Sequence, residues 1–152
     1  MGLSETKLTS RAATFSFKDQ DEYKTFYSCN NEAPFSTGVT LLVYKSLAKN
    51  IHQVNRIEGH ILVLHLRFKG KKKLCIIQVY LPSDKQANNK LQKHIQKIIK
   101  REKLVNTNII IMGDFNTVNN PLTDRSNNTK DPLNSSKKKW KSESELFSYL
   151  KT

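Results

Sequence analysis

Apolar residues gather in three runs, separated by polar segments, that predict β-strands. The runs cover residues 38–44, 60–68 and 74–80 and are rich in valine, isoleucine, leucine and aromatic residues, which suit a packed, pleated surface. The segment between the last two runs is short and basic and contains Gly70, a composition typical of a hairpin turn. The pattern therefore predicts one strand followed by an antiparallel pair.

The hydrophobic period changes after residue 84. Between residues 85 and 103, apolar side chains recur at helical spacing while lysines occupy mostly the other faces, which predicts an amphipathic helix packed on a sheet. The nearly continuous apolar run at residues 108–112 predicts a central, buried strand. The apolar positions of the helix are Ala87, Leu91, Ile95, Ile98 and Ile99.

The two ends of the chain predict less regular structure. Residues 1–37 are polar with scattered aromatic side chains, and we expect a loop-rich connection with at most a short strand. Residues 117–141 are rich in asparagine, lysine and serine and predict a long loop. Residues 142–150 predict a short helix, capped by Ser142 or Ser144. Together the elements predict an α/β (α+β) fold.

Length and composition remove several classes of protein. The 152 residues make a single domain, and no apolar run approaches the 18 residues of a membrane span. The amino terminus lacks the apolar core of a signal peptide. Cys29 and Cys75 cannot form a disulfide framework and lack the spacing of a metal-binding motif. We expect reduced thiols in an intracellular protein, nuclear or cytoplasmic.

The formal charge of +13 favours a polyanionic partner, nucleic acid above all. An A/T-rich genome would also enrich lysine and asparagine without any selection for binding, so both explanations stay open. On the predicted helix, Lys93, Lys97 and Lys100 are candidates for contacts with nucleic-acid phosphates. A solvated helix face would carry the same residues. Nothing in the sequence indicates a specific protein partner.

Isolated polar residues stand where predicted strands end. Asp114 and Asn116 follow the buried strand, Tyr80 ends the strand before the helix, and Glu5 follows a short apolar stub. In open α/β architectures ligands bind beyond the carboxyl ends of strands. Oxygen donors of this kind suit a hard divalent cation and a phosphate better than a soft metal.

At these positions the sequence resembles the endonuclease/exonuclease/phosphatase superfamily with its DNase I-like fold, and most closely the endonuclease domains of non-LTR retrotransposons and their AP-endonuclease-like relatives. LSETK at residues 3–7 is like the family's LQETK, VYLP at 79–82 is like VYAP, and MGDFN at 112–116 is like GDFN. The remaining matching pieces, in chain order around these, are Gly38-Val39, Glu58-Gly59 and Asp124-Arg125.

The resemblance implies a four-layered sandwich with a mixed or antiparallel sheet, and a role for each matching residue. Glu5 would hold a divalent ion, Mg²⁺ or Mn²⁺, which can stabilise charge on a phosphate. Tyr80 would contact the scissile phosphate, Asp114 would position or deprotonate the attacking water, and Asn116 would orient the phosphate. The implied activity is metal-dependent phosphodiester cleavage of nucleic acid, DNA above all.

The sequence also departs from the family. Relatives have a strand and helix before the LQET segment, whereas here Met1 stands almost directly before it, and their terminal Ser-Asp-His motif has no match. In place of the family's Glu-Gly-Arg stands Glu58-Gly59-His60, and we expect His60 only to begin a strand. We therefore expect residues 1–152 to form one partial domain, a retrotransposon-derived remnant with little or no activity alone.

Two other functions stay open. A basic protein that binds nucleic acid without cutting it would show the same charge and a strongly salt-dependent affinity. The superfamily also includes phosphoesterases that act on inositol phosphates or lipids, so a related activity is the second alternative.

Overall fold

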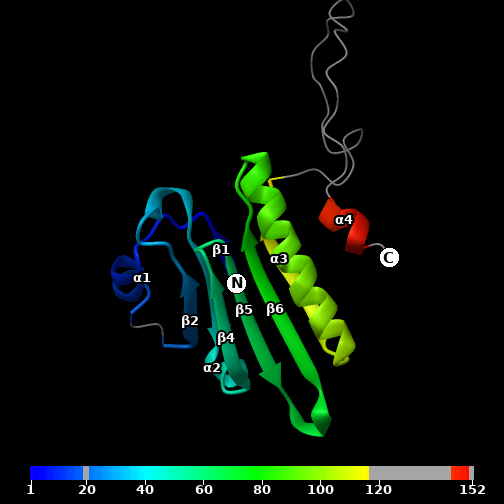
Figure 1. Ribbon diagram of the computed structural model, residues 1–152. Helices are drawn as coiled ribbons and strands as arrows, with labels where there is room; N and C mark the ends of the chain where they lie inside the picture. The colour runs from blue at the N-terminus through cyan, green and yellow to red at the C-terminus, as the bar shows by residue number, and fades with distance from the viewer. Residues whose placement is uncertain (19–20, 117–144, 151–152) are drawn as a thin grey trace, which may run out of the picture.

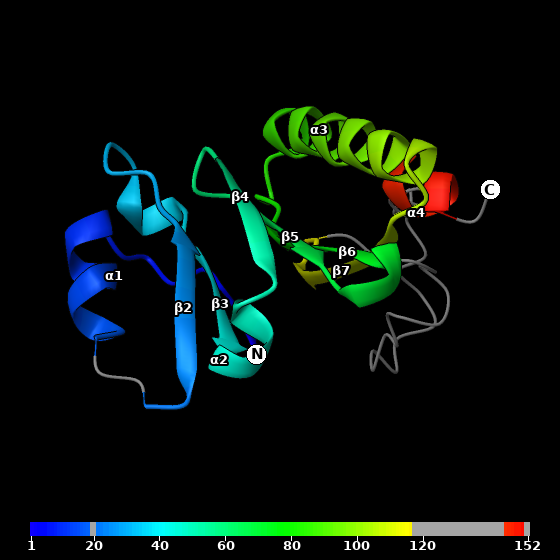
Figure 2. The same ribbon diagram turned by 90° about the horizontal axis from the view of Figure 1, so that it is seen from below.

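The computed structural model describes residues 1–18, 21–116 and 145–150. Two sheets lie face to face, with α1 (Ser10–Ser16) outside one sheet and α3 (Lys85–Leu104) outside the other (Figures 1 and 2). The first sheet has the order β1-β3-β2 and is antiparallel. Its strands are β1 (Gly2–Ser4), β2 (Tyr23–Ser28) and β3 (Val39–Tyr44).

The second sheet has the order β4-β5-β6-β7 and is mixed. The first three strands pair antiparallel, whereas β7 lies parallel to β6 because the chain crosses over through α3. The predicted hairpin turn is a 3-10 turn (Lys69–Lys71) with Gly70 at a φ of 72°. The strands are β4 (Ile51–Ile57), β5 (Ile61–Arg67), β6 (Lys73–Tyr80) and β7 (Asn108–Asp114).

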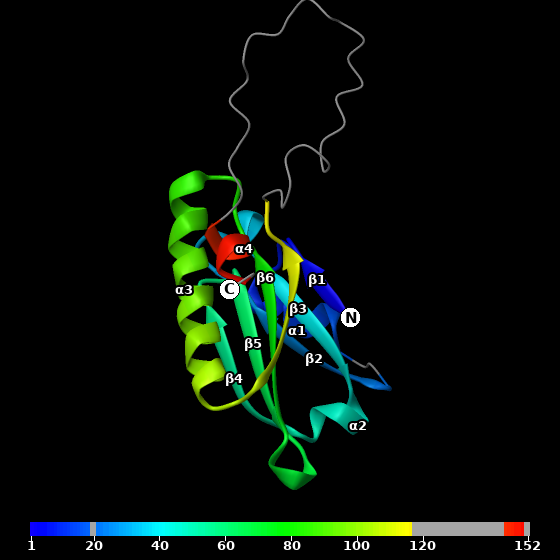
Figure 3. The ribbon, with the colours of Figure 1, turned by 90° about the vertical axis from the view of Figure 1, so that its right-hand side faces the viewer.

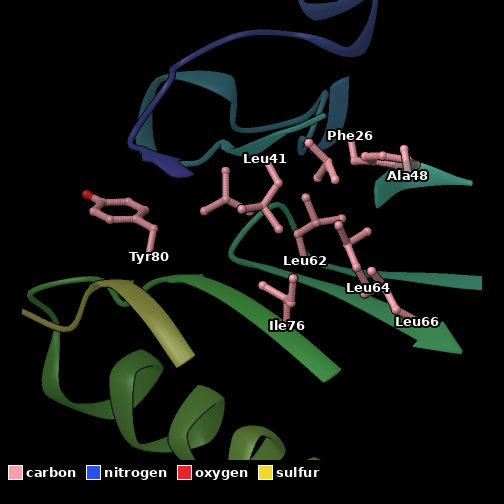
Figure 4. Close-up of a cluster of buried hydrophobic side chains, with 10 residues drawn as sticks. Phe26, Leu41, Ala48, Leu62, Leu64, Leu66, Ile76 and Tyr80 are labelled. Atoms are coloured by element: carbon pink, nitrogen blue, oxygen red, sulfur yellow. The ribbon is translucent and has the colours of Figure 1, made fainter. Parts of the chain in front are cut away.

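Alternation along the strands divides the core into two layers. On β5, Leu62 and Leu64 point toward the first sheet and pack with residues such as Phe26 and Leu41 (Figure 4). Ile61 and Val63, one position out of step, point toward α3. Because both faces of β5 and β6 are covered, these strands are almost wholly apolar. The four layers and the mixed sheet with flanking helices confirm the predicted fold class.

Helix α3 begins where the sequence predicts. Asp84 caps it, accepting a hydrogen bond from the backbone N–H of Ala87 (2.8 Å). Leu91, Ile95 and Ile99 are buried against the sheet, as their helical spacing predicts. No helix in the described ranges has the length and apolar character that crossing a membrane requires.

The last predicted helix is present as α4 (Glu145–Leu150), which lies beside α3 (Figure 3). Leu146 is buried there, and its backbone N–H donates to the side chain of Gln92 (3.0 Å). The predicted loop at residues 117–141 and the candidate caps Ser142 and Ser144 lie outside the described residues.

The expectation for residues 1–37 was wrong, because this segment forms β1, α1 and β2 as well as a 3-10 turn (Pro34–Ser36). Thr9 caps α1, its side-chain oxygen accepting a hydrogen bond from the backbone N–H of Ala12 (3.2 Å). Ala13 is the buried residue of this helix. β1 has only three residues and depends on its pairing with β3. Its hydrophobic pattern is therefore too short to predict a strand from the sequence. β4 and the single-turn α2 (Lys45–Ala48) also had no prediction.

Candidate active site

The parallel pairing of β6 and β7 brings two of the candidate residues together. Tyr80 and Asp114, the last residues of these strands, lie directly opposite each other in the register. Beyond them, the backbone N–H of Leu81 donates to the carbonyl oxygen of Asp114 (2.8 Å). The site therefore starts at the carboxyl ends of two adjacent parallel strands, where α/β sheets bind ligands.

The opposite sheet supplies the third residue, Glu5. Ser4, at the end of β1, donates its hydroxyl to the carbonyl of Val79 (3.0 Å), and Gln78 donates its amide to the same hydroxyl (2.9 Å). These bonds hold the end of β1 against β6. Glu5 follows directly, at a φ of 56°, and its carboxylate lies close enough to the Tyr80 hydroxyl to raise the pKa of the phenol.

Tyr80 lies at the centre of this arrangement. Its ring is buried at one end of the layer between the sheets, with the hydroxyl turned away from the leucines (Figure 4). Burial raises the pKa of Tyr80, and the nearby carboxylates of Glu5 and Asp114 raise it further. The phenol therefore remains neutral at physiological pH and can donate a hydrogen bond.

Asn116 fixes the turn that follows β7. Its backbone N–H donates to a carboxylate oxygen of Asp114 (2.9 Å), and its side-chain amide donates to the carbonyl of Leu81 (2.7 Å). The amide of Asn88, on α3, donates to the carbonyl of Pro82 (2.8 Å) and also contacts that of Phe115 (3.4 Å). In this structure Asn116 orients the Asp114 carboxylate, while its amide nitrogen is engaged by the backbone.

The segments that resemble the family converge in space. The backbone N–H of Thr6 donates to Gly38 (3.0 Å), and that of Gly38 donates to Gly59 (2.9 Å). Glu5, Glu58 and Asn116 all have positive φ angles (56°, 50° and 44°), which are uncommon for residues with a side chain and gather at functional sites. Five sequence segments that lie far apart in the chain thus meet around one end of the two sheets.

The charges around this end are mixed. The ammonium group of Lys7 lies 3.2 Å from the Glu5 carboxylate, and that of Lys90 lies 3.0 Å from Glu58. The hydrogen bond from Lys90 is the main reason why the pKa of Glu58 is lowered. Both ion pairs are well exposed and leave the carboxylates accessible from solvent.

Glu5 and Asp114 are the residues best suited to hold a metal here. Asp114 is exposed at the strand end, and the side chain of Glu5 is 44% exposed. With the phenol of Tyr80 beside them, the groups that converge are oxygen donors, which fit Mg²⁺ or Mn²⁺.

The structure does not bring the candidate lysines to this site. Lys93, Lys97 and Lys100 are exposed on α3, which covers the opposite face of the β4–β7 sheet from the β1–β3 sheet (Figure 2). They form a separate basic face. Asp124 and Arg125 lie outside the described residues.

Sequence reasoning missed the position of His60. Its ring stacks on that of Tyr80, with the centroids 5.7 Å apart, and its Nδ1 donates to the Tyr80 carbonyl (2.9 Å). His60 therefore supports the ring and backbone of Tyr80 in addition to preceding a strand. No local signal could reveal this contact, because it depends on the pairing of β5 with β6.

Sequence reasoning also missed a buried cluster at the other end of the β4–β7 sheet. His65, Cys75 and Glu102 bring ligand atoms within 4.8 Å of one another. The cysteine spacing matches no metal motif and so did not indicate Cys75, but the fold supplies partners that the spacing does not.

Comparisons with known proteins agree with the architecture. No protein-family model and no curated protein sequence matches the chain at a significant level. Among solved structures, TDP2 from Caenorhabditis elegans matches 77% of this chain with a TM-score of 0.57 and 17% identity. A truncated form of the same protein matches with a TM-score of 0.53 and 18% identity. TDP2 has the DNase I-like fold of the endonuclease/exonuclease/phosphatase superfamily.

The chain shares this DNase I-like architecture. It spans 37% of the length of the TDP2 chain and 49% of the truncated form, so it corresponds to part of that fold.

Proposed function

We propose that this chain carries part of the active site of a DNase I-like, metal-dependent phosphodiesterase that acts on nucleic acid. The observation that carries the proposal is the convergence of Glu5, Tyr80 and Asp114 from three separate segments at the ends of two sheets. Two carboxylates beside a neutral phenol can hold a divalent cation and a phosphate together. The likeness to TDP2 supports the class through the fold alone.

Each side chain has a defined task in this proposal. A cation held by Glu5 and Asp114 would stabilise negative charge on the phosphate. The neutral hydroxyl of Tyr80 donates to a phosphate oxygen, and the Asp114 carboxylate, kept in place by Asn116, accepts a proton from water. His60 keeps the Tyr80 ring in position through stacking.

We expect the chain alone to have little or no cleavage activity. The likeness covers less than half of the length of the TDP2 chains, and removing members of a set that acts as a unit is disproportionately costly. The order of the motif-like segments supports an origin in a retrotransposon. Sequencing the flanking genomic DNA would test this, because a reverse transcriptase frame should lie nearby.

Calorimetry tests the metal site directly. Mg²⁺ or Mn²⁺ should bind in roughly the millimolar range, because few protein oxygens are available and Mg²⁺ retains several waters. Glu5→Gln should abolish the binding, whereas Glu32→Gln, which removes an exposed carboxylate elsewhere, should leave it unchanged. Identical titrations of wild type and Glu5→Gln would remove Glu5 from the site and refute the proposal.

Plasmid nicking tests the catalytic part. We expect no more Mg²⁺-dependent nicking of supercoiled DNA by wild type than by Asp114→Asn. Strong nicking that Asp114→Asn abolishes would overturn the expectation of weak activity and identify a working nuclease.

The exposed lysines of α3 favour a second function, binding of nucleic acid without cleavage. Replacing Lys93, Lys97 and Lys100 by glutamine should lower the slope of log affinity against log salt by about one unit per lost phosphate contact. The matched control replaces Lys69, Lys71 and Lys72, which are exposed at the β5–β6 turn. Equal losses in the two triple variants would mean that net charge alone accounts for binding.

A further inference from the structure

A buried cluster of ionisable side chains lies at the opposite end of β6 from Tyr80. His65 on β5 and Cys75 on β6 are direct cross-strand partners, and both point to the face that α3 covers. Glu102, near the end of α3, completes the cluster. His65 and Glu102 are 6% exposed and Cys75 is fully buried, so the three groups are largely removed from water.

Burying this cluster costs free energy unless its groups bind a partner. The neighbouring positions on this face, such as Ile61 and Ile77, are apolar and fully buried, and ionisable groups in such surroundings lose favourable hydration. The Nδ1 of His65 lies 3.7 Å from a Glu102 oxygen, longer than a good hydrogen bond. The Glu102 carboxylate is held at 3.0 Å by Arg101, whose side chain is 55% exposed.

A fourth donor stands at the edge of the cluster. β4 contains an irregularity between Ile51 and Gln53, which leaves His52 outside the regular register with β5. Bulges of this kind re-aim a side chain, and the His52 ring lies 6.1 Å from that of His65. His52, His65 and Glu102 line the same hollow of about 340 Å³, which opens a path from solvent.

We propose that His65, Cys75 and Glu102, with His52 as the fourth ligand, form a zinc-binding site. Imidazole, thiolate and carboxylate are the ligands of Zn²⁺, which prefers four in a tetrahedron. Metal–ligand distances of about 2.0–2.3 Å put neighbouring ligand atoms about 3.5 Å apart. The three buried groups are already within 4.8 Å and close the difference by side-chain rotation. The bound ion ties β4, β5 and β6 to the end of α3.

Metal binding changes the protonation of one ligand. The Cys75 thiol would give up its proton to solvent, so the affinity for the ion should rise with pH. The Asn55 amide contacts Nε2 of His65 (3.5 Å), which leaves Nδ1 turned toward Glu102.

Cobalt substitution of the full chain tests the proposal. Co²⁺ should give the near-ultraviolet absorption of a thiolate–cobalt bond, and Zn²⁺ should abolish that absorption by displacement. Cys75→Ser should remove the band, whereas Cys29→Ser, which alters a thiol outside the cluster, should retain it. A wild-type protein without the band, or a band that survives Cys75→Ser, would overturn the proposal.

Two further variants guard against misfolding of Cys75→Ser and against confusion with the proposed active site. His52 is exposed, so His52→Gln should fold normally and weaken Co²⁺ binding by at least about tenfold. Glu5→Gln should leave the band unchanged, because Glu5 lies at the other end of the sheets. Unchanged binding in His52→Gln would refute the four-ligand site, and loss of the band in Glu5→Gln would place the metal elsewhere.

Discussion

Gly113→Ala should be among the most damaging single substitutions near the candidate site. Gly113 lies in β7 immediately before Asp114, at a φ of 133° that residues with a side chain rarely adopt. A Cβ atom there would collide with the carbonyl oxygen of Val79, on the adjacent strand β6. Neither partner can yield, because the obstacle is backbone in a parallel ladder and not the end of a flexible side chain.

The expected cost follows from two contributions. Holding alanine at this φ costs about 1–3 kcal/mol, and forcing an extra methyl group into a packed site costs about 1–3 kcal/mol more. The total of about 2–6 kcal/mol is a large part of the roughly 5–15 kcal/mol that stabilises a typical domain. Relief of the collision by moving β7 would also displace Asp114, so Mg²⁺ binding should weaken in the fraction that still folds.

Urea unfolding followed by circular dichroism measures this cost, with Gly70→Ala as the matched control. Gly70 also has a positive φ, 72°, but a methyl group added there would meet no heavy atom within 4 Å. The control should therefore lose only about 1–2 kcal/mol from backbone conformation. If Gly113→Ala destabilised the protein no more than Gly70→Ala, the close approach of β6 and β7 at Val79 would be refuted.

Two more predictions concern the site and the core. Comparing spectrophotometric titrations of wild type and Tyr80→Phe should give a pKa for Tyr80 above the ordinary 10.0, and Glu5→Gln should lower that pKa. Because the pKa is higher in the folded than in the unfolded protein, protonated Tyr80 contributes to the free energy of unfolding at pH values below 10.0. The contribution is lost as the pH rises past the pKa of Tyr80 in the folded protein. An unchanged titration in Glu5→Gln would contradict the influence of the Glu5 carboxylate on the pKa of Tyr80. Leu64 is fully buried between the sheets, so Leu64→Ala should lower the free energy of unfolding by about 2–5 kcal/mol. Leu104 is 80% exposed, so Leu104→Ala should change that free energy by less than about 0.5 kcal/mol. Equal effects of the two substitutions would contradict the packing of the sheets.

Periodicity predicted the elements that are buried on both sides or along one full face. β5, β6 and α3 carry long apolar patterns because two layers pack against them. β4 escaped prediction because it is an edge strand whose exposed positions include His52 and Gln53, and because the irregularity between Ile51 and Gln53 breaks the alternation. β2 is also an edge strand, with Phe26 and Ser28 its only buried residues.

The candidate site was partly accessible from the sequence. The motif-like segments indicated Glu5, Tyr80 and Asp114, and the parallel pairing of β6 with β7 brought the last two together. The closeness of Tyr80 to Glu5 depends on how the two sheets pack. The stacking of His60 depends on strand pairing. Both are long-range outcomes that no local pattern encodes.

Part of the buried cluster could be predicted from the sequence, and the other part depends on the topology of the fold. His65 and Cys75 are equidistant from Gly70, so a hairpin centred there already places them opposite each other, as the observed register does. Glu102 arrives only because the crossover helix returns its last turns to the start of β6. The position of the turn therefore predicts that two of the four proposed zinc ligands lie side by side, whereas the other two depend on the topology of the fold.

The two proposed metal sites differ in chemistry as well as in place. Beyond the carboxyl end of β6 the donors are oxygens, which suit a hard cation that keeps its waters. Near its amino end they are the nitrogen, sulfur and oxygen of three buried side chains together with the exposed His52, and such donors suit Zn²⁺. Excess Mg²⁺ should therefore leave a Co²⁺–thiolate band intact, since Mg²⁺ does not compete for sulfur. The thiolate band can therefore be titrated in the presence of Mg²⁺, and either of the two proposals can fail without the other.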